Sequence, residues 1–227
     1  MFQRPGGVEL TEKAVAGLPQ GSVLLDVGCG TGDTVAYLNG RGFRAFGVDC
    51  DEKVIATAPD TAIRRLFSAD AANLPFGPGV FDAVLFECSM SKIENQESAL
   101  SEAFRVLRPG GRIAIADFYS QGEGHADAGV LGRIEGLDAF SGKLKAAGFS
   151  PMKTEDCTSS LRALWGQLIF ETGKARLIGQ LGILEEFIGT YGYFLLVAHR
   201  RPDATKHGDS GPAAGRRAMR DDKPAMP

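Results

Sequence analysis

The chain has 227 residues, of which 44% are hydrophobic, and a formal net charge of −3. This length and apolar content suffice for one large α/β domain with a complete core. The apolar runs fall short of the ~18 residues that a membrane helix needs, and residues 1–7 lack the apolar stretch of a signal peptide. We therefore expect a cytoplasmic protein without a membrane partner. The slightly negative charge argues against a nucleic acid partner.

The first motif joins a strand to a glycine-rich turn. Residues 23–27 have the length and β-branched content of a buried parallel strand. Gly28, Gly30 and Gly32 follow it and let a ligand lie against bare backbone. In nicotinamide and flavin enzymes the related spacing is G-x-G-x-x-G, but here Asp33 stands at the last position. A carboxylate suits a pyrophosphate poorly, whereas the amino acid end of S-adenosylmethionine carries an ammonium, so we expect that cofactor.

Two acidic residues follow at the distances that such a cofactor requires. Residues 44–48 read as a second strand, and Asp49 ends it 21 residues after Gly28, where a carboxylate can accept both ribose hydroxyls. A third strand leads into Asp70 and Ala71. We expect the Asp70 carboxylate to accept a hydrogen bond from the adenine amino group and the Ala71 N–H to reach a ring nitrogen.

The next elements repeat the alternation of strand and helix. Residues 81–86 read as a fourth strand, and an amphipathic helix runs from there to Leu107, with apolar residues at helical spacing. Residues 108–111 then turn the chain into a fifth strand, 112–117. A chain of alternating strands and helices favours a parallel sheet covered on both faces.

Five segments in this order, LLDVGCGTG, FGVD, SADAANLPF, FDAVLFE and LRPGGRIAIAD, carry a resemblance that covers about residues 10–200. The chain resembles the class I S-adenosylmethionine-dependent methyltransferases. The resemblance implies a Rossmann-like, doubly wound α/β sheet of seven strands, mostly parallel with an antiparallel last strand. It also implies that residues 1–200 form the methyltransferase domain and that a helical insertion at about 158–190 covers the substrate.

The resemblance further implies which residues hold S-adenosylmethionine. Asp26 would anchor the amino acid end of the cofactor, Asp49 would hold the ribose, and Glu87 would lie near the methionine part and the substrate. The remaining cofactor-binding positions lie in the glycine turn and around the adenine: Gly28, Cys29, Gly30, Gly32, Cys50, Asp70 and Ala71.

The second half of the chain is expected to form the substrate side. Apolar residues within 160–170 recur at helical spacing, with Ser159 or Ser160 as the N-cap. Trp165 and Phe170 would either line a substrate pocket or pack on the sheet. The other expected elements are a helix at 136–147, a strand at 151–157, a helix at 180–188 and the last strand at 193–198.

The composition changes after Arg200. Residues 201–227 are rich in Gly, Ala, Pro and charged residues and contain almost no large apolar side chains. Such a segment buries too little apolar surface to offset the entropy of ordering. We therefore expect a disordered tail.

Direct in-line transfer of the sulfonium methyl group to a small-molecule acceptor is the expected reaction. A general base is needed only if the acceptor is protonated. The candidates for a catalytic role are Glu87 and Cys88 after the fourth strand and His125 in a Gly-rich stretch, and the sequence assigns none of them. The four cysteines form no C-x-x-C pair and no other metal motif is present, so no metal is expected.

Three alternatives stay open at this point. Besides small-molecule methyl transfer, the sequence is compatible with a protein that binds S-adenosylmethionine without transferring its methyl group, with a nicotinamide oxidoreductase, and with a methyltransferase that acts on a metalloid such as arsenite with the help of thiols. The last alternative arises because Cys29, Cys50 and Cys88 all follow expected strands. The expected partner is a small molecule, and the protein is expected to be a monomer or a homodimer.

Overall fold

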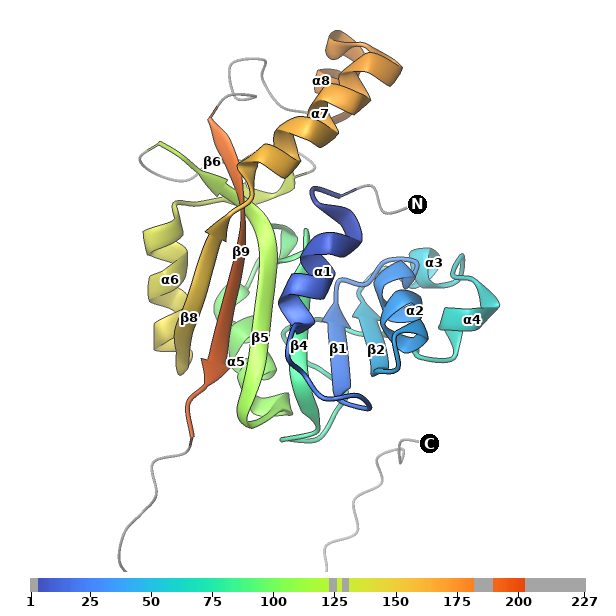
Figure 1. Ribbon diagram of the computed structural model, residues 1–227, viewed down its shortest axis with the longest axis vertical. Helices are drawn as coiled ribbons and strands as arrows, with labels where there is room; N and C mark the ends of the chain where they lie inside the picture. Colours follow the sequence, from blue (N-terminus) through green and yellow to red (C-terminus); the bar gives the residue numbers. More distant parts are fainter. Residues whose placement is uncertain (1–3, 123–125, 128–130, 182–189, 203–227) are drawn as a thin grey trace, which may run out of the picture.

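A seven-stranded sheet with helices on both faces forms the body of the protein (Figure 1). The computed structural model describes residues 4–122, 126–127, 131–181 and 190–202. The strand order is β3-β2-β1-β4-β5-β9-β8. Its strands are β1 (Val23–Val27), β2 (Arg44–Asp49), β3 (Leu66–Ser68), β4 (Phe81–Glu87), β5 (Leu107–Ser120), β8 (Phe149–Asp156) and β9 (Tyr191–Arg200).

The directions of the strands confirm the predicted topology. β1 to β5 pair in parallel, and β9 pairs antiparallel with both of its neighbours, β5 and β8. β9 therefore runs against the other six strands, and it is the last strand in the chain. A separate two-stranded ribbon consists of β6 (Ala126–Asp127) and β7 (Arg133–Ile134).

The helices cover the two faces of the sheet. They are α1 (Gly7–Val15), α2 (Asp33–Gly40), α3 (Glu52–Ile55), α4 (Asp60–Ile63), the 3-10 helix η1 (Met90–Lys92), α5 (Gln96–Val106), α6 (Leu137–Ala146), α7 (Thr158–Thr172) and α8 (Lys174–Leu181). Leu24 of β1 packs in the apolar cluster that contains residues of α1 and α2, and the next residue, Leu25, packs in the cluster that contains residues of α5 and α6. Because adjacent side chains of a strand point to opposite faces, β1 is buried on both sides, as its mostly apolar sequence predicts.

Helix α7 differs from its prediction. It begins at Thr158, and neither Ser159 nor Ser160 is its N-cap. The Oδ1 atom of Asp156, at the end of β8, accepts a hydrogen bond from the Thr158 N–H at 2.9 Å. The cap prediction was wrong because a side chain of the preceding strand supplies the first acceptor.

The apolar residues of α7 also divide into two groups. Trp165 is buried, with 6% of its surface exposed, and belongs to the core cluster on the α1 face. Phe170 is 93% exposed. The interpretation of Phe170 as a pocket residue is therefore wrong for this structure, and Trp165 packs in the core.

Two further predictions concern residues that lie mostly outside the part of the chain that the structure describes. The predicted helix at 180–188 overlaps α8 only at its first two positions, and residues 182–189 lie outside the described part. Residues 203–227 of the predicted tail lie outside it as well. The domain limits and the tail thus stay predictions.

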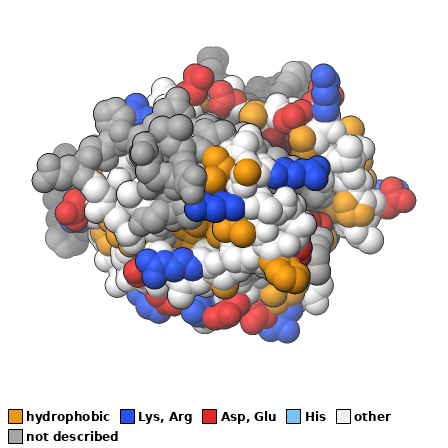
Figure 2. All heavy atoms as spheres, turned by 90° about the horizontal axis from the view of Figure 1, so that it is seen from above, with side chains coloured by type: hydrophobic (Ala, Val, Ile, Leu, Met, Phe, Trp, Pro, Cys, Tyr) orange, Lys and Arg blue, Asp and Glu red, His pale blue; other side chains and the backbone are white. Residues whose placement is uncertain are grey.

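The surface at the end of the molecule that carries α7 and α8 has a mixed character. Figure 2 shows acidic, basic and apolar side chains interspersed over the described part of this face. This mixture differs from the continuous basic stripe that tracks a nucleic acid backbone. Within the described residues, no helix is both long and apolar enough to cross a membrane.

Candidate functional site

The glycine turn lies between β1 and α2 and is bound to the end of β2. The N–H groups of Gly28 and Cys29 both donate to the carbonyl oxygen of Val48, at 2.8 and 3.0 Å. Gly28, Gly30 and Gly32 all have positive φ angles, of 78°, 53° and 78°. This conformation holds the turn at the carboxyl edge of the parallel strands, where ligands of open α/β sheets bind.

The three glycines of the turn differ in what surrounds them. A Cβ atom on Gly28 would overlap the side chain of Ser89, and one on Gly32 would lie 2.8 Å from the Cδ1 atom of Leu66. A Cβ atom on Gly30 would meet only the Val54 Cγ1 atom, at 3.9 Å. Packing therefore explains two of the glycines, whereas the space over Gly30 is open for a ligand.

Asp49 lies directly beside this open position. Its Oδ2 atom accepts a hydrogen bond from the Gly30 N–H at 2.9 Å, and its Oδ1 atom accepts one from the Asp51 N–H at 2.9 Å. The carboxylate is half-buried and held in place by two backbone donors. The structure thus brings Asp49 and the glycine turn together, as the sequence predicts.

Cys50, Asp70 and Ala71 lie around the ends of β2 and β3. The two strand ends are joined by a hydrogen bond from the Ala69 N–H to the Asp49 carbonyl oxygen at 3.0 Å. The Asp70 side chain is exposed, and its Oδ1 atom accepts a hydrogen bond from the Ala72 N–H at 2.8 Å. Cys50 is exposed as well. Cys50, Asp70 and Ala71 therefore lie on the β2 and β3 side of the open space over Gly30.

Asp26 lies under the turn, with 4% of its surface exposed. Burial raises its pKa well above the ordinary value of 3.8, and the negative charge of Glu87 adds to this effect. The positive charge of Arg4 acts in the opposite direction. Asp26, Glu87 and Arg4 therefore form one electrostatic group beneath the glycine turn.

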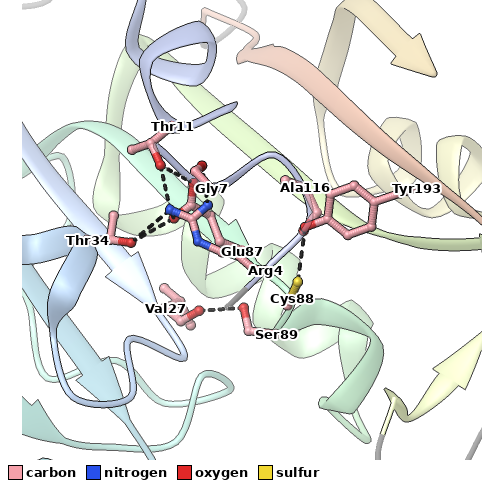
Figure 3. A network of polar contacts seen from close by, with 10 residues as sticks. All are labelled: Arg4, Gly7, Thr11, Val27, Thr34, Glu87, Cys88, Ser89, Ala116 and Tyr193. Atoms are coloured by element: carbon pink, nitrogen blue, oxygen red, sulfur yellow. Dashed lines mark hydrogen bonds and ion pairs between the residues drawn. The ribbon is translucent and has the colours of Figure 1, made fainter. Parts of the chain in front are cut away.

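Glu87, at the end of β4, is held by three side chains from elsewhere in the chain (Figure 3). The Thr11 hydroxyl donates to its Oε1 atom at 2.9 Å, and the Thr34 hydroxyl donates to its Oε2 atom at 2.9 Å. Arg4 forms an ion pair with Oε2 at 2.9 Å. Both carboxylate oxygens are thus engaged, and only 5% of the side chain is exposed.

Cys88, the next residue, has an unusual backbone conformation. Its φ angle is 55°, and its Sγ atom lies 3.0 Å from the Oη atom of Tyr193. Burial raises the pKa of the Cys88 thiol to about 12, and the nearby charge of Asp117 adds to the rise. The thiol is therefore protonated near neutral pH and is a poor nucleophile.

Two of the other cysteines are also buried and protonated. Cys29 and Cys157 are buried, and burial raises the pKa of each thiol. In the described part of the chain, no group of three or more His, Cys, Asp and Glu side chains is arranged to hold a metal ion. His125 lies outside the described residues.

The comparisons with known proteins decide the family. The family model described as a methyltransferase domain matches residues 25–115. The chain is 32% identical over 205 residues to the O-methyltransferase cnsE of Penicillium expansum, a match that covers 80% of this chain and 73% of that protein. The chain belongs to the class I S-adenosylmethionine-dependent methyltransferases. It is an enzyme of this family, and its cofactor is S-adenosylmethionine.

A second relative supports this assignment, and a solved structure supports the fold. The methyltransferase is 32% identical over 177 residues to the 27-O-demethylrifamycin SV methyltransferase of Amycolatopsis mediterranei, with 69% of this chain and 65% of that protein covered. Its fold matches that of phosphoethanolamine N-methyltransferase 2 of Haemonchus contortus, solved in complex with S-adenosyl-L-methionine. That match has a TM-score of 0.71 and 18% identity and covers 87% of this chain and 54% of the other.

Four residues that contact Glu87 and Cys88 were not predicted from the sequence. Arg4, Thr11 and Thr34 hold Glu87, and Tyr193 holds Cys88. None of the four lies in a glycine turn or directly after a strand, the two local patterns that mark candidate residues in the sequence. Their roles depend on contacts between distant segments, for which a single sequence contains no local signal.

Proposed function

We propose that this methyltransferase transfers the methyl group of S-adenosylmethionine to a hydroxyl oxygen of a small, largely apolar molecule. The observation that supports the site most strongly is the open space over Gly30 beside the fixed carboxylate of Asp49. The choice of oxygen rests on the two relatives described above, whose names state O-methylation.

In this proposal the residues around the glycine turn bind the cofactor. The Asp49 carboxylate accepts the ribose hydroxyls, and Asp26 faces the positively charged amino acid end. Gly28, Cys29, Gly30 and Gly32 form the backbone surface under the cofactor, and Cys50, Asp70 and Ala71 lie at its adenine end. Two carboxylates near a cationic ligand supply favourable electrostatics in a partly buried site.

The acceptor side of the site is proposed to be apolar. Phe118 of β5 packs edge-on against Tyr193 of β9, with 5.3 Å between the ring centroids. Cys88 and Phe118 are only partly buried and pack against the apolar core cluster on the α1 face. Such surroundings favour an acceptor with an apolar ring or chain and exclude water from the reacting atoms.

The cofactor, when bound, supplies an electrophilic methyl group, so the protein's main task is to align the acceptor. Glu87 is proposed to position the segment after β4, since both of its oxygens already accept hydrogen bonds. Cys88 adds a neutral thiol to the acceptor side of the proposed site. His125 remains a candidate proton acceptor. A phenolic or enolic hydroxyl ionises easily, and it is therefore the oxygen acceptor that depends least on a base.

The proposal is tested with methyl-labelled S-adenosylmethionine and a panel of acceptors. The panel contains phenols, enols, aliphatic alcohols, amines and arsenite, each with and without an apolar substituent. We expect labelled product from an apolar phenol or enol, and formation of S-adenosylhomocysteine in equal amount. Transfer only to amines or arsenite would overturn the choice of oxygen. Tight cofactor binding without product from any acceptor, or from an extract of the source cell, would favour a binding protein without transfer activity.

Asp49→Ala is the control that links activity to the proposed cofactor site. Loss of a charge-assisted acceptor should weaken cofactor binding by about 1.5 to 3 kcal/mol. Asp49→Asn keeps one oxygen acceptor for the Gly30 N–H and should lose less. Calorimetry with S-adenosylhomocysteine measures both variants, and unchanged affinity in a folded Asp49→Ala protein would remove Asp49 from the site.

A further inference from the structure

The turn after β4 is held in a conformation that its sequence does not favour. Cys88, at a φ angle of 55°, is the only residue other than glycine with a positive φ in the part of the chain that the structure describes. A side chain at this φ angle meets its own backbone, so L residues other than Asn and Asp rarely adopt it. A tertiary contact must therefore hold Cys88 in this conformation.

That contact comes from Tyr193 of β9 (Figure 3). The Tyr193 hydroxyl donates to the carbonyl oxygen of Ala116 at 3.0 Å, and the Cys88 N–H donates to the same oxygen at 2.8 Å. Since a tyrosine hydroxyl has a single proton, its oxygen is left to accept the S–H of Cys88, 3.0 Å away. Tyr193 is fully buried, which fixes the hydroxyl in place.

The turn that Tyr193 holds is in direct contact with the cofactor turn. The Ser89 hydroxyl donates to the carbonyl oxygen of Val27 at 2.6 Å, at the end of β1. The Ser89 side chain also fills the space beside Gly28, where a Cβ atom would overlap it. Ser89 therefore connects Cys88 directly to the backbone of the glycine turn.

We propose that Tyr193 is a positioning residue, whose hydroxyl locks Cys88 in the left-handed conformation and thereby sets the glycine turn for S-adenosylmethionine. The inference rests on the cofactor site described above but not on the acceptor. Burial raises the pKa of Tyr193 well above its ordinary value of 10, so the phenol keeps its proton. The thiol keeps its proton for the same reason, and the direction of the two hydrogen bonds is fixed.

The test is the affinity for S-adenosylhomocysteine, measured by calorimetry in four test variants and one control variant. Tyr193→Phe removes one oxygen atom and is expected to weaken binding by about tenfold, the scale of one buried hydrogen bond. Cys88→Ala keeps the unfavourable φ angle without the S–H and should weaken binding by a similar factor. Cys88→Gly adopts the same φ angle without strain and should recover most of the affinity that Cys88→Ala loses.

The decisive variant is Cys88→Gly combined with Tyr193→Phe. Glycine adopts a positive φ angle without a contact that holds it there. The combined variant should therefore bind within about twofold of Cys88→Gly alone, so that Cys88→Gly removes the loss of affinity caused by Tyr193→Phe. If the tyrosine hydroxyl only stabilises the fold, Tyr193→Phe should lower the melting temperature equally with and without Cys88→Gly. In that case Cys88→Gly should not restore the affinity. Tyr37→Phe, which removes a hydroxyl that donates to Glu12 at 2.5 Å, is the matched control and should bind normally.

Two outcomes would overturn the proposal: unchanged affinity in Tyr193→Phe, or an equal loss in the presence and absence of Cys88→Gly. If Tyr193→Phe does not fold, Cys88→Ala still tests the proposal. This variant changes a side chain in a turn rather than in a strand, and it removes the same contact between the two residues. If the wild-type protein itself fails to bind S-adenosylhomocysteine, the cofactor site is wrong. If binding follows the expected pattern but oxygen acceptors are not methylated, only the proposed acceptor is wrong.

Discussion

Arg4 Nη2 lies 2.9 Å from Glu87 Oε2, and the two side chains are only 11% and 5% exposed. This ion pair ties the segment before α1 to the end of β4. At the other end of α1, the Arg112 side chain donates to the carbonyl oxygens of Ala14 and Ala16 at 3.0 and 2.8 Å. Helix α1 is thus fixed at both ends, and the end near the cofactor turn is held by a buried charge pair.

The first prediction concerns this pair. Arg4→Met removes the positive charge and keeps an apolar stem, which leaves the Glu87 carboxylate buried with only two threonine donors. We expect a loss of about 3 kcal/mol in the free energy of unfolding at pH 7, the scale of a broken buried ion pair. Urea denaturation measures it.

Glu87→Gln is the partner variant for a double-mutant cycle. A glutamine oxygen still accepts from a threonine hydroxyl, and no charge is left unpaired when Arg4→Met is added. The combined variant should therefore be more stable than Arg4→Met alone. Additive losses in the two single variants would show that the contact between Arg4 and Glu87 does not stabilise the fold.

The second prediction compares Gly30, which faces the open space proposed for the ligand, with Gly32, which faces the core. Gly30→Ala should fold, since only the Val54 Cγ1 atom lies near the added methyl group, and its melting temperature should fall by a few degrees because of the positive φ angle. Its affinity for S-adenosylhomocysteine should fall at least tenfold. In Gly32→Ala the added methyl group would press on Leu66 and Ala62, so the loss of stability should be larger. Thermal unfolding and calorimetry distinguish the two, and a Gly30→Ala protein that binds normally would contradict the open site.

The pH dependence of stability should report on Asp26. Its pKa in the folded state is raised, first by burial, then by Glu87. The folded state therefore binds the proton more tightly than the unfolded state. The resulting stability is fully present below the ordinary pKa of 3.8 and is lost as the pH rises through the raised value.

Asp26→Asn removes this titration. Without ligand, the variant should be more stable than the wild type at pH 7, and its unfolding free energy should change less between pH 4 and pH 8. Asp70→Asn, a change at an exposed carboxylate, serves as the control and should follow the wild-type profile. Denaturation at a series of pH values gives both curves, and an Asp26→Asn curve parallel to that of the wild type would argue against a raised pKa.

The cysteines should differ strongly in their reaction with iodoacetamide at pH 7.5. Cys50 is exposed and should be alkylated first, whereas Cys29 and Cys157 are buried and the Cys88 thiol is protonated. If Cys50 lies beside the adenine, a saturating amount of S-adenosylhomocysteine should slow its alkylation severalfold. Mass spectrometry of the peptides measures each rate. Equal rates for Cys50 with and without the ligand would place the adenine elsewhere.

The sequence alone determined the fold and the position of the glycine turn after β1. Leu24 and Leu25 belong to a five-residue strand buried on both faces, and the glycines follow it at once. Such signals are local, because a strand, a turn and a helix start are encoded by neighbouring residues. Asp49 was found for the same reason, since it ends the next strand and parallel strands gather their ends at one edge.

The tertiary structure decided what the residues after β4 do. The sequence presented Glu87 as a candidate base, but its partners Arg4, Thr11 and Thr34 come from other elements, with Thr11 76 residues away in the chain. Cys88 likewise depends on Tyr193, 105 residues away. Hydrophobic periodicity tells which face of an element is buried but not which polar side chains meet in space. Only the packed fold brought these donors and acceptors together, and burial then fixed the charges and protons that they carry.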